Sequence, residues 1–254
     1  MYEISSTGKF IVIYSFCFVS NCADGNEPLG GLVMDSSGNL YGTTLYGGTA
    51  SFGNGVVFKL SKSAKGKWKG TVLHAFNGGS DGAFLQGASL TLVTKTVGKT
   101  KRNLLFGVTF EGGTGGCTGG CGTAFELTES KTGYTYSELY SFTGTGGRDG
   151  AYPEGTLISV NGALFGTTMV GGVGQNCVYG GENGCGTVFE LTEKNHTWTE
   201  TVLYRFTGGT DGSYPISGLL AAPDGKLLYG LAGAGGDTTC DPPVGCGVAY
   251  TVKP

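Results

Sequence analysis

The sequence predicts an all-β protein, a four-bladed β-propeller with about 62 residues in each blade. Four short segments each recur four times along the 254 residues. They are rich in Val, Ile, Phe, Tyr and Thr and are bounded by Gly, Asn, Asp or Ser, which is typical of strands. Helical periodicity of the apolar residues is nowhere sustained. A repeat of four antiparallel strands is the unit of a propeller blade, whereas solenoid repeats are shorter and simpler.

The four recurring segments are the expected strands of each blade, described here from the centre outwards. The innermost is an apolar run before a polar turn, at residues 31–35, 88–92, 155–159 and 218–222. The second has a central glycine, which suits the crowded space near the axis, at residues 40–44, 105–109, 164–168 and 228–232. The third begins with glycine, at residues 55–60, 122–127, 186–191 and 247–252. The outermost ends in phenylalanine, at residues 12–16, 72–76, 138–142 and 202–206.

The connections between the two inner strands have the chemistry of hairpin turns. Residues 35–39, 160–163 and 223–226 contain the Gly, Asn and Asp that supply the positive φ of a tight reversal. The same connection in the second unit, residues 93–103, is longer and carries three lysines and Arg102. We expect a protruding, solvated hairpin there.

The two chain ends are expected to close the ring within a single domain. The chain starts with an outer strand, residues 11–16, and its last unit contains only three strands, residues 217–252. The repeat units are then approximately 17–76, 77–142, 143–206, and 207–254 completed by 1–16. The run Tyr2-Glu3-Ile4 resembles a third strand and has no place in that ring, so we expect it to pair at a blade edge, to fray, or to add to a neighbouring subunit.

The eight cysteines form four pairs of near neighbours in Gly-rich or Pro-rich loops. They are Cys17 and Cys22, Cys117 and Cys121, Cys177 and Cys185, and Cys240 and Cys246. Local disulfides that stiffen loops explain this pattern best. Free buried thiols and zinc ligation are the alternatives, but only two of the pairs have the spacing of zinc ligands and the chain has only two histidines. Disulfides indicate an extracellular, cell-surface or periplasmic protein.

Composition narrows the class of partner. Charged residues make up 14% of the chain and the formal net charge is -3, so no basic surface is available to bind nucleic acid. No apolar stretch approaches the roughly 20 residues of a membrane helix, and residues 1–10 lack the pattern of a signal peptide. Membrane insertion and nucleic acid binding are therefore not expected.

The laid-out repeat resembles a known family. Residues 28–60 and 200–219 carry most of a pattern with a Gly-Gly-x-Asp-Gly-x-x-Pro crossing, a Gly-Asn-Leu-Tyr-Gly-Thr-Thr strand and a Gly-Thr-Val-Phe-x-Leu strand, which is similar to the GloVer-type tandem repeats of bacterial exported proteins. Unit two departs from it, with Phe84-Leu85 where Pro is expected and Val108 for a Thr. Residues 31–44 also resemble the inner half of an NHL-type propeller blade. The resemblance implies an exported, often surface-attached protein, and it implies no chemistry.

One face of the propeller is expected to be elaborate, because the long Gly-rich connections all emerge there. Each crossing between units holds one Asp-Gly pair, with the aspartates at Asp24, Asp81, Asp149 and Asp211. These carboxylates are weak candidates for calcium ligation or for binding sugar hydroxyls. A capped Asp-Gly turn is the plainer interpretation, since a residue that recurs in every unit is usually architectural. No other cofactor is expected.

Residues that differ between units are better candidates for ligand contact. Those that map to the elaborate face are Tyr46, Phe52, Phe110, Glu111, Arg148, Tyr152, Glu154, Tyr179, Glu182 and Tyr214. Aromatic rings with scattered carboxylates are typical of carbohydrate recognition, because the apolar faces of sugars stack on rings. Ordinary loop aromatics that shield the disulfides would give the same pattern.

The sequence therefore favours a secreted or surface module that binds carbohydrate or a cell-surface polymer. His74, in an outer strand, and His196, in a turn, are not placed for catalysis, and no catalytic residue is assigned. Two alternatives stay open. One is a structural subunit that self-associates into a fibre through the spare strand at Tyr2 to Ile4. The other is a polysaccharide-degrading enzyme that uses Glu111, Glu154 and Glu182.

Overall fold

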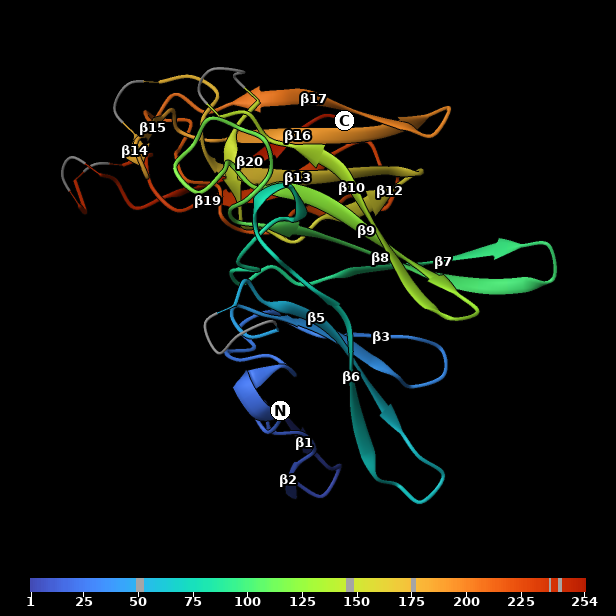
Figure 1. Ribbon diagram of the computed structural model, residues 1–254. Helices are drawn as coiled ribbons and strands as arrows, with labels where there is room; N and C mark the ends of the chain where they lie inside the picture. The colour runs from blue at the N-terminus through green and yellow to red at the C-terminus, as the bar shows by residue number, and fades with distance from the viewer. Residues whose placement is uncertain (49–52, 145–148, 175–176, 238, 242–243) are drawn as a thin grey trace.

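The computed structural model confirms the all-β prediction, and it describes residues 1–48, 53–144, 149–174, 177–237, 239–241 and 244–254. Four small antiparallel sheets are arranged as a four-bladed β-propeller (Figure 1). Among these residues, no helix is long and apolar enough to span a membrane.

The blades have the predicted order of strands from the centre outwards. Blade 1 contains β3 (Val33–Met34), β4 (Leu40–Thr44), β5 (Val56–Lys62) and β6 (Trp68–Ala75). Blade 2 contains β7 (Thr91–Val97), β8 (Thr100–Thr109), β9 (Thr123–Ser130) and β10 (Gly133–Ser141). Blade 3 contains β12 (Ile158–Val160), β13 (Ala163–Val170), β16 (Thr187–Lys194) and β17 (Thr197–Arg205), with β11 (Ala151–Pro153) also paired to β13. Blade 4 contains β18 (Leu220–Ala221), β19 (Leu228–Ala232) and β20 (Val248–Val252).

Each second strand packs closely against its own third strand because of its central glycine. A Cβ atom on Gly42 would lie 2.7 Å from the ring of Phe58, and one on Gly166 would lie 2.6 Å from the ring of Phe189. Both distances are shorter than van der Waals contact, so only glycine fits there. The long connection of unit two is the protruding hairpin β7–β8, which closes between Val97 and Thr100.

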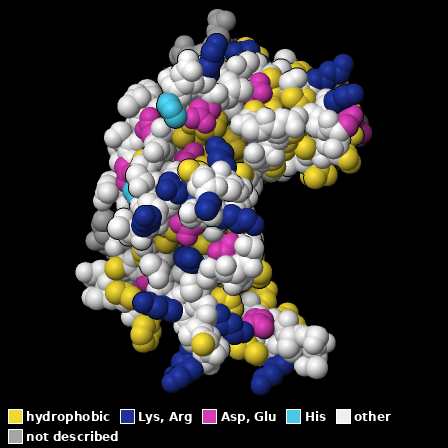
Figure 2. All heavy atoms as spheres, turned by 90° about the vertical axis from the view of Figure 1, so that its right-hand side faces the viewer, with side chains coloured by type: hydrophobic (Ala, Val, Ile, Leu, Met, Phe, Trp, Pro, Cys, Tyr) yellow, Lys and Arg dark blue, Asp and Glu magenta, His cyan; other side chains and the backbone are white. Residues whose placement is uncertain are grey.

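The predicted closure of the ring is wrong. β2 (Phe10–Val12) pairs with β1 (Tyr2–Ile4), and the sheet of blade 4 contains only β18, β19 and β20. The pairing of Tyr2 with Val12 has the same register as Phe58 with Val72 in blade 1. The hairpin β1–β2 is therefore the outer half of a further blade, and it lies at the opposite end of the molecule from blade 4. Figure 2 accordingly shows an arc that is open on one side.

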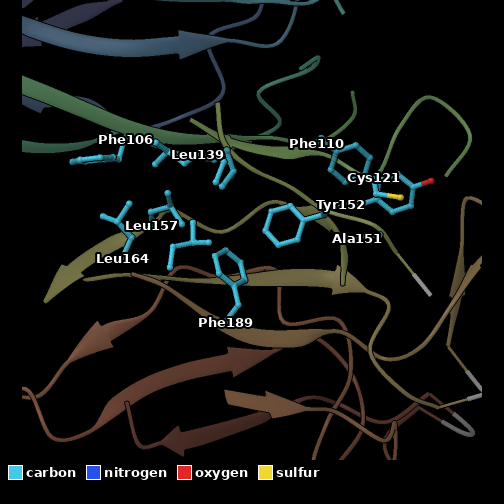
Figure 3. Packing of buried hydrophobic residues seen from close by; sticks show 14 of the residues in the cluster. Phe106, Phe110, Cys121, Leu139, Ala151, Tyr152, Leu157, Leu164 and Phe189 are labelled. Carbon is cyan, nitrogen blue, oxygen red and sulfur yellow. The ribbon is translucent and has the colours of Figure 1, made fainter. Parts of the chain in front are cut away.

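The blades are held together by apolar layers between them. The largest layer lies between blades 2 and 3, where Phe106 and Leu139 face Leu157, Leu164 and Phe189 (Figure 3). A phenylalanine that follows each outer strand packs edge-on against the third strand of the next blade. The ring centroids of Phe76 and Phe125 are 5.2 Å apart, those of Phe142 and Phe189 5.0 Å, and those of Phe206 and Tyr250 4.9 Å. At the start of the chain, Phe16 packs on Phe58 at 4.8 Å in the same way.

The four predicted disulfides are all formed. They join Cys17 to Cys22, Cys117 to Cys121, Cys177 to Cys185 and Cys240 to Cys246. No cysteine is left for zinc ligation. Each bond closes a loop of only a few residues, so it restrains that loop rather than the whole chain.

Candidate functional site

The loops after the second strands and the crossings between blades meet on one face, as predicted. Short backbone bridges join Asn26 to Tyr46 in blade 1, Ala83 to Glu111 in blade 2 and Ser213 to Ala234 in blade 4. β11 plays the same part in blade 3 by pairing with the end of β13. We call this the loop face. It is on the left in Figure 1, and the tight strand hairpins point to the right.

The repeated aspartates act within their own crossings. The Asp149 carboxylate accepts hydrogen bonds from the Tyr140 hydroxyl at 2.7 Å and from the backbone N–H and hydroxyl of Thr143. Asp24 accepts from Tyr14 at 2.9 Å, and Asp211 accepts from Tyr204 at 3.0 Å. In blade 1, His74 Nε2 lies 2.9 Å from Asp81. Each aspartate thus ties the end of an outer strand to the turn that enters the next blade.

These contacts favour the architectural interpretation over calcium ligation. A carboxylate that accepts two or three hydrogen bonds from its own turn stabilises that turn directly. In the described part of the chain, no group of three or more His, Cys, Asp or Glu side chains is placed to hold a metal ion.

The crossings also hold a residue with an unusual backbone. Glu27, Phe84, Tyr152 and Tyr214 occupy equivalent positions, and all have φ between 54° and 58°. Non-glycine residues in this left-handed region are uncommon. Packing compensates at three of them: Phe84 meets Tyr46 edge-on at 5.8 Å, Tyr152 stacks on Phe110 at 5.0 Å, and Tyr214 packs at the edges of the layers on both sides of blade 3.

The richest cluster of predicted ligand residues lies where blades 2 and 3 meet on the loop face. Phe110, Tyr152 and Tyr179 form three mutual ring contacts, with centroids 5.0, 5.7 and 6.0 Å apart. Phe110 and Tyr152 are 5% and 2% exposed, so these two rings belong to the core, whereas Tyr179 is 42% exposed. Figure 3 shows Phe110, Cys121 and Tyr152 together at one end of the buried layer. We call Phe110, Glu111, Tyr152, Tyr179 and Glu182 the blade 2–3 cluster.

Short, rigid loops hold the members of this cluster. Tyr179 and Glu182 are on the small hairpin β14 (Val178–Tyr179) and β15 (Glu182–Asn183), which lies inside the loop closed by Cys177 and Cys185. The tip of this hairpin, at Gly180, lies against the Tyr152 hydroxyl, because a Cβ on Gly180 would be 2.7 Å from that oxygen. The Glu111 carboxylate lies in the same way against Gly119, inside the Cys117–Cys121 loop.

The charges of two carboxylates influence the pKa of Tyr152, the central tyrosine of the cluster. Burial raises the pKa of Tyr152, and the charges of Glu182 and Glu111 raise the pKa further. Burial also raises the pKa of the Glu111 carboxyl. The Glu182 carboxylate lies beside the Cys117–Cys121 disulfide, since it and both sulfur atoms come within 3.0 Å of the position of a Cβ on Gly144. The cluster is therefore an aromatic surface bordered by acidic oxygens.

The remaining predicted residues are not members of this cluster, although Tyr214 lies next to it. Tyr46 is at the equivalent place between blades 1 and 2, and the hydroxyl of Tyr214 accepts a hydrogen bond from the Val178 N–H at 3.2 Å. Glu154 follows β11, and burial raises the pKa of its carboxyl, but it is not among the charges that act on Tyr152. Phe52 and Arg148 lie outside the described residues.

Two features of the loop face do not follow from the sequence. The Tyr152 position could not be recognised as buried, since an aromatic residue in a Gly-rich loop looks exposed. Gly119 and Gly180 also gave no signal as close neighbours of the carboxylate and the tyrosine. The sequence could have hinted at the first feature, because Phe84, Tyr152 and Tyr214 recur at one position of the repeat.

Comparison with known proteins gives only distant likenesses. No family model matches the chain, and no curated protein matches it. Among solved structures, the chain is similar to an alpha-L-arabinofuranosidase from Lactobacillus brevis, with 11% identity and a TM-score of 0.42 over 87% of this chain and 70% of that one. It is also similar to GH43B of a Bacteroides ovatus xyloglucan PUL, with 12% identity and a TM-score of 0.39 over 89% of this chain and 38% of that one. A third is the GH43 BlXynB protein from Bacillus licheniformis, with 14% identity and a TM-score of 0.36 over 84% and 37%. At this distance the likenesses say nothing about activity.

Proposed function

We propose that the protein is an extracellular binding module that holds carbohydrate at the blade 2–3 cluster. The observation that carries the proposal is the half-exposed ring of Tyr179, which rests on the two buried rings of Phe110 and Tyr152. An aromatic face that is fixed from behind offers a stacking surface for the apolar face of a sugar ring at little entropic cost. The four disulfides fit an oxidising compartment, where exported binding modules work.

The two carboxylates of the cluster indicate whether the bound sugar is neutral or acidic. Carboxylate oxygens accept hydrogen bonds from hydroxyl groups, and Glu111 and Glu182 are both close enough to Tyr152 for their charges to raise its pKa. A polysaccharide that carries its own carboxylates or sulfates would be repelled by these charges. The proposal is therefore for a neutral polysaccharide, either free or as part of a cell-surface polymer.

The test is a titration of neutral and acidic oligosaccharides by calorimetry. Tyr179→Ala should weaken binding of the neutral ligand at least about tenfold, since stacking and aromatic burial contribute more than about 1.4 kcal/mol. Phe18→Ala, which removes an exposed aromatic ring from the first crossing, far from the cluster, is the control and should leave affinity unchanged. Absence of binding to any neutral glycan, or equal binding by the Tyr179→Ala variant, would contradict the proposal.

A second candidate function is hydrolysis of a polysaccharide at the same cluster. It is favoured by the position of Glu111 beside Tyr152 and by burial, which shifts the pKa of the Glu111 carboxyl upwards, the direction that a general acid requires. Release of reducing sugar that is abolished by Glu111→Gln, and not by Glu154→Gln, would assign this activity. Binding without any release of sugar would leave the protein as a binding module.

A further inference from the structure

Blade 4 presents an apolar face that none of the described residues covers. In each blade, alternate residues of the second strand face the next blade. At one of these positions Tyr41, Phe106 and Phe165 are 0%, 3% and 2% exposed, whereas the equivalent Tyr229 of blade 4 is 43% exposed. Two positions along, Val108 is 1% exposed and Leu231 is 58% exposed.

This face is broad and slightly hollow. It includes Leu220, which is 69% exposed, and it surrounds a shallow cavity of about 460 Å3 lined also by Tyr229, Leu231 and Ala249. No charged side chain lines this cavity. We call Leu220, Tyr229, Leu231 and Ala249 the C-terminal face.

The hairpin β1–β2 presents a second apolar face at the other end of the arc. Tyr2, Ile4, Phe10 and Val12 are each 60% to 62% exposed, and the rings of Tyr2 and Phe10 stack at 5.0 Å. We call these four residues the N-terminal face. By register, Tyr2 and Ile4 correspond to Phe58 and Leu60 of blade 1, which are 1% and 0% exposed.

The two faces are the two halves of one interface that already occurs inside the chain. In the contact between blades 1 and 2, Tyr41 and Val57 pack against Phe125 and Leu127. In the contact between blades 3 and 4, Phe165 and Val188 pack against Tyr250 and Leu228. Positions equivalent to the C-terminal face are occupied by Tyr41, Val57, Phe165 and Val188. Positions equivalent to the N-terminal side of a blade are occupied by Phe125, Leu127, Tyr250 and Leu228. A strand surface that is buried in every internal contact and exposed at both ends is suited to the same contact between molecules.

We propose that a second copy of this chain docks its N-terminal face on the C-terminal face of the first. The hairpin of the same chain does not fill this place, because it lies beside blade 1 at the other end of the molecule from blade 4 (Figure 1). It is held there by the hydrogen bond from the Tyr14 hydroxyl to Asp24, by the packing of Phe16 on Phe58, and by the contact of Lys62 with Glu3 at 4.0 Å.

The proposed contact joins two different faces, so it is heterologous. Each bound copy leaves one face of each kind free, and assembly continues into a chain of molecules unless the geometry closes a ring. Both faces are uncharged and apolar. Association should therefore resist high salt, unlike a contact between charged surfaces.

The experiment measures molar mass by light scattering over a range of protein concentration. The intact protein should exceed its monomer mass of 26.0 kDa, with a mass that increases with concentration. Leu231→Lys damages only the C-terminal face and Ile4→Lys only the N-terminal face. Each should weaken association at least about tenfold, because burial of an unpaired ammonium in an apolar contact is strongly unfavourable. Val97→Lys, at the tip of the protruding hairpin β7–β8, changes a residue with 53% exposure on neither face and should have no effect.

Mixing the two damaged variants gives the decisive result. Leu231→Lys keeps an intact N-terminal face and Ile4→Lys keeps an intact C-terminal face, so an equimolar mixture should form a dimer of about 52 kDa and nothing larger. A mixture that stays monomeric overturns the proposal. So does an intact protein that remains at 26.0 kDa at all concentrations, which would indicate that each chain covers its own faces. Glycan binding at Tyr179 is measured separately, so its failure does not affect this test.

Discussion

The contact between blades 1 and 2 and the contact between blades 2 and 3 share one framework but are filled differently at one position. Both have a phenylalanine packed on the next blade, Phe76 and Phe142, and both have a crossing aspartate. At equivalent places on the outer strands stand Tyr136 and Glu200, which pair in register with Leu127 and Leu191. The ring of Tyr136 stacks on His74 at 4.4 Å, whereas Glu200 is half-buried and its buried Oε1 has no hydrogen-bond partner among the described residues.

The difference separates what the repeat must keep from what it can vary. Phenylalanine and aspartate recur because they join every blade to the next. The position of Tyr136 and Glu200 lies beside that framework, so a ring and a carboxyl group are both accommodated there. Burial, together with the charge of Asp149, raises the pKa of Glu200 to about 7, so this position makes the stability of the second contact depend on pH.

The largest expected effect comes from removing the shared phenylalanine. Phe142→Ala should lower the free energy of unfolding by about 3–5 kcal/mol, since the ring is fully buried and a cavity would remain. Phe16→Ala removes the same residue from the contact at the N-terminal end, where the side chain is only half-buried, and should cost less than half as much. Urea titration of both variants measures the difference, and equal losses would contradict the idea that burial sets the effect.

The crossing aspartates should rank next. Asp149→Ala should cost about 2–3 kcal/mol, because the hydroxyl of Tyr140 and the backbone N–H of Thr143 would lose their acceptor inside the protein. Asp211 accepts the same bonds from Tyr204 and Thr207 at an exposed site, where water can replace it. Asp211→Ala should therefore cost about 1 kcal/mol or less, as judged by thermal unfolding of the two variants. Equal costs would show that exposure does not matter at these turns.

The smallest expected effect is a gain in stability on replacing Glu200. A carboxyl group whose pKa is higher in the folded than in the unfolded protein stabilises the fold below the unfolded value of 4.5, and this contribution is lost as the pH rises through about 7. Glu200→Gln should therefore stabilise the protein at pH 8 by about 1–2 kcal/mol, allowing for partial solvent screening, and should change little at pH 4.5. Unfolding at the two pH values, with Glu138→Gln in blade 2 as a partly exposed comparison, measures this; a gain that is equal at both pH values would rule out titration as its cause.

Much of the fold followed from local patterns in the sequence. The order of strands within a blade, the hairpin at residues 93–103, the four disulfides and the strand segments were predicted correctly, except that the first outer strand, expected at residues 12–16, is at Phe10–Val12. Each of these depends on residues close together in the chain or on a pattern repeated four times. Closure of the ring depends on two segments at opposite ends of the chain, and that prediction failed.

The candidate site was predicted only as a set of residues on one face. The sequence placed Phe110, Tyr152 and Tyr179 on the loop face, but it could not show that the first two are buried beneath the third. It also could not show that the charges of Glu111 and Glu182 raise the pKa of Tyr152 whereas the charge of Glu154 does not. These relations depend on how two neighbouring blades are placed, which no local pattern encodes.

Local sequence is enough to define the blades, because strand propensity, turn residues and close cysteine pairs act over a few residues. Which segment pairs with the outer strand Phe10–Val12 depends instead on how distant parts of the chain are arranged in space. Tyr2-Glu3-Ile4 and Tyr250-Thr251-Val252 both have the pattern of a third strand, so the sequence contains two candidates for that edge. The first pairs with it across a short turn at residues 5–9, whereas the second would have to bring together the two ends of the arc. A short loop costs less conformational entropy to close than a long one, so the local hairpin forms and the propeller stays open.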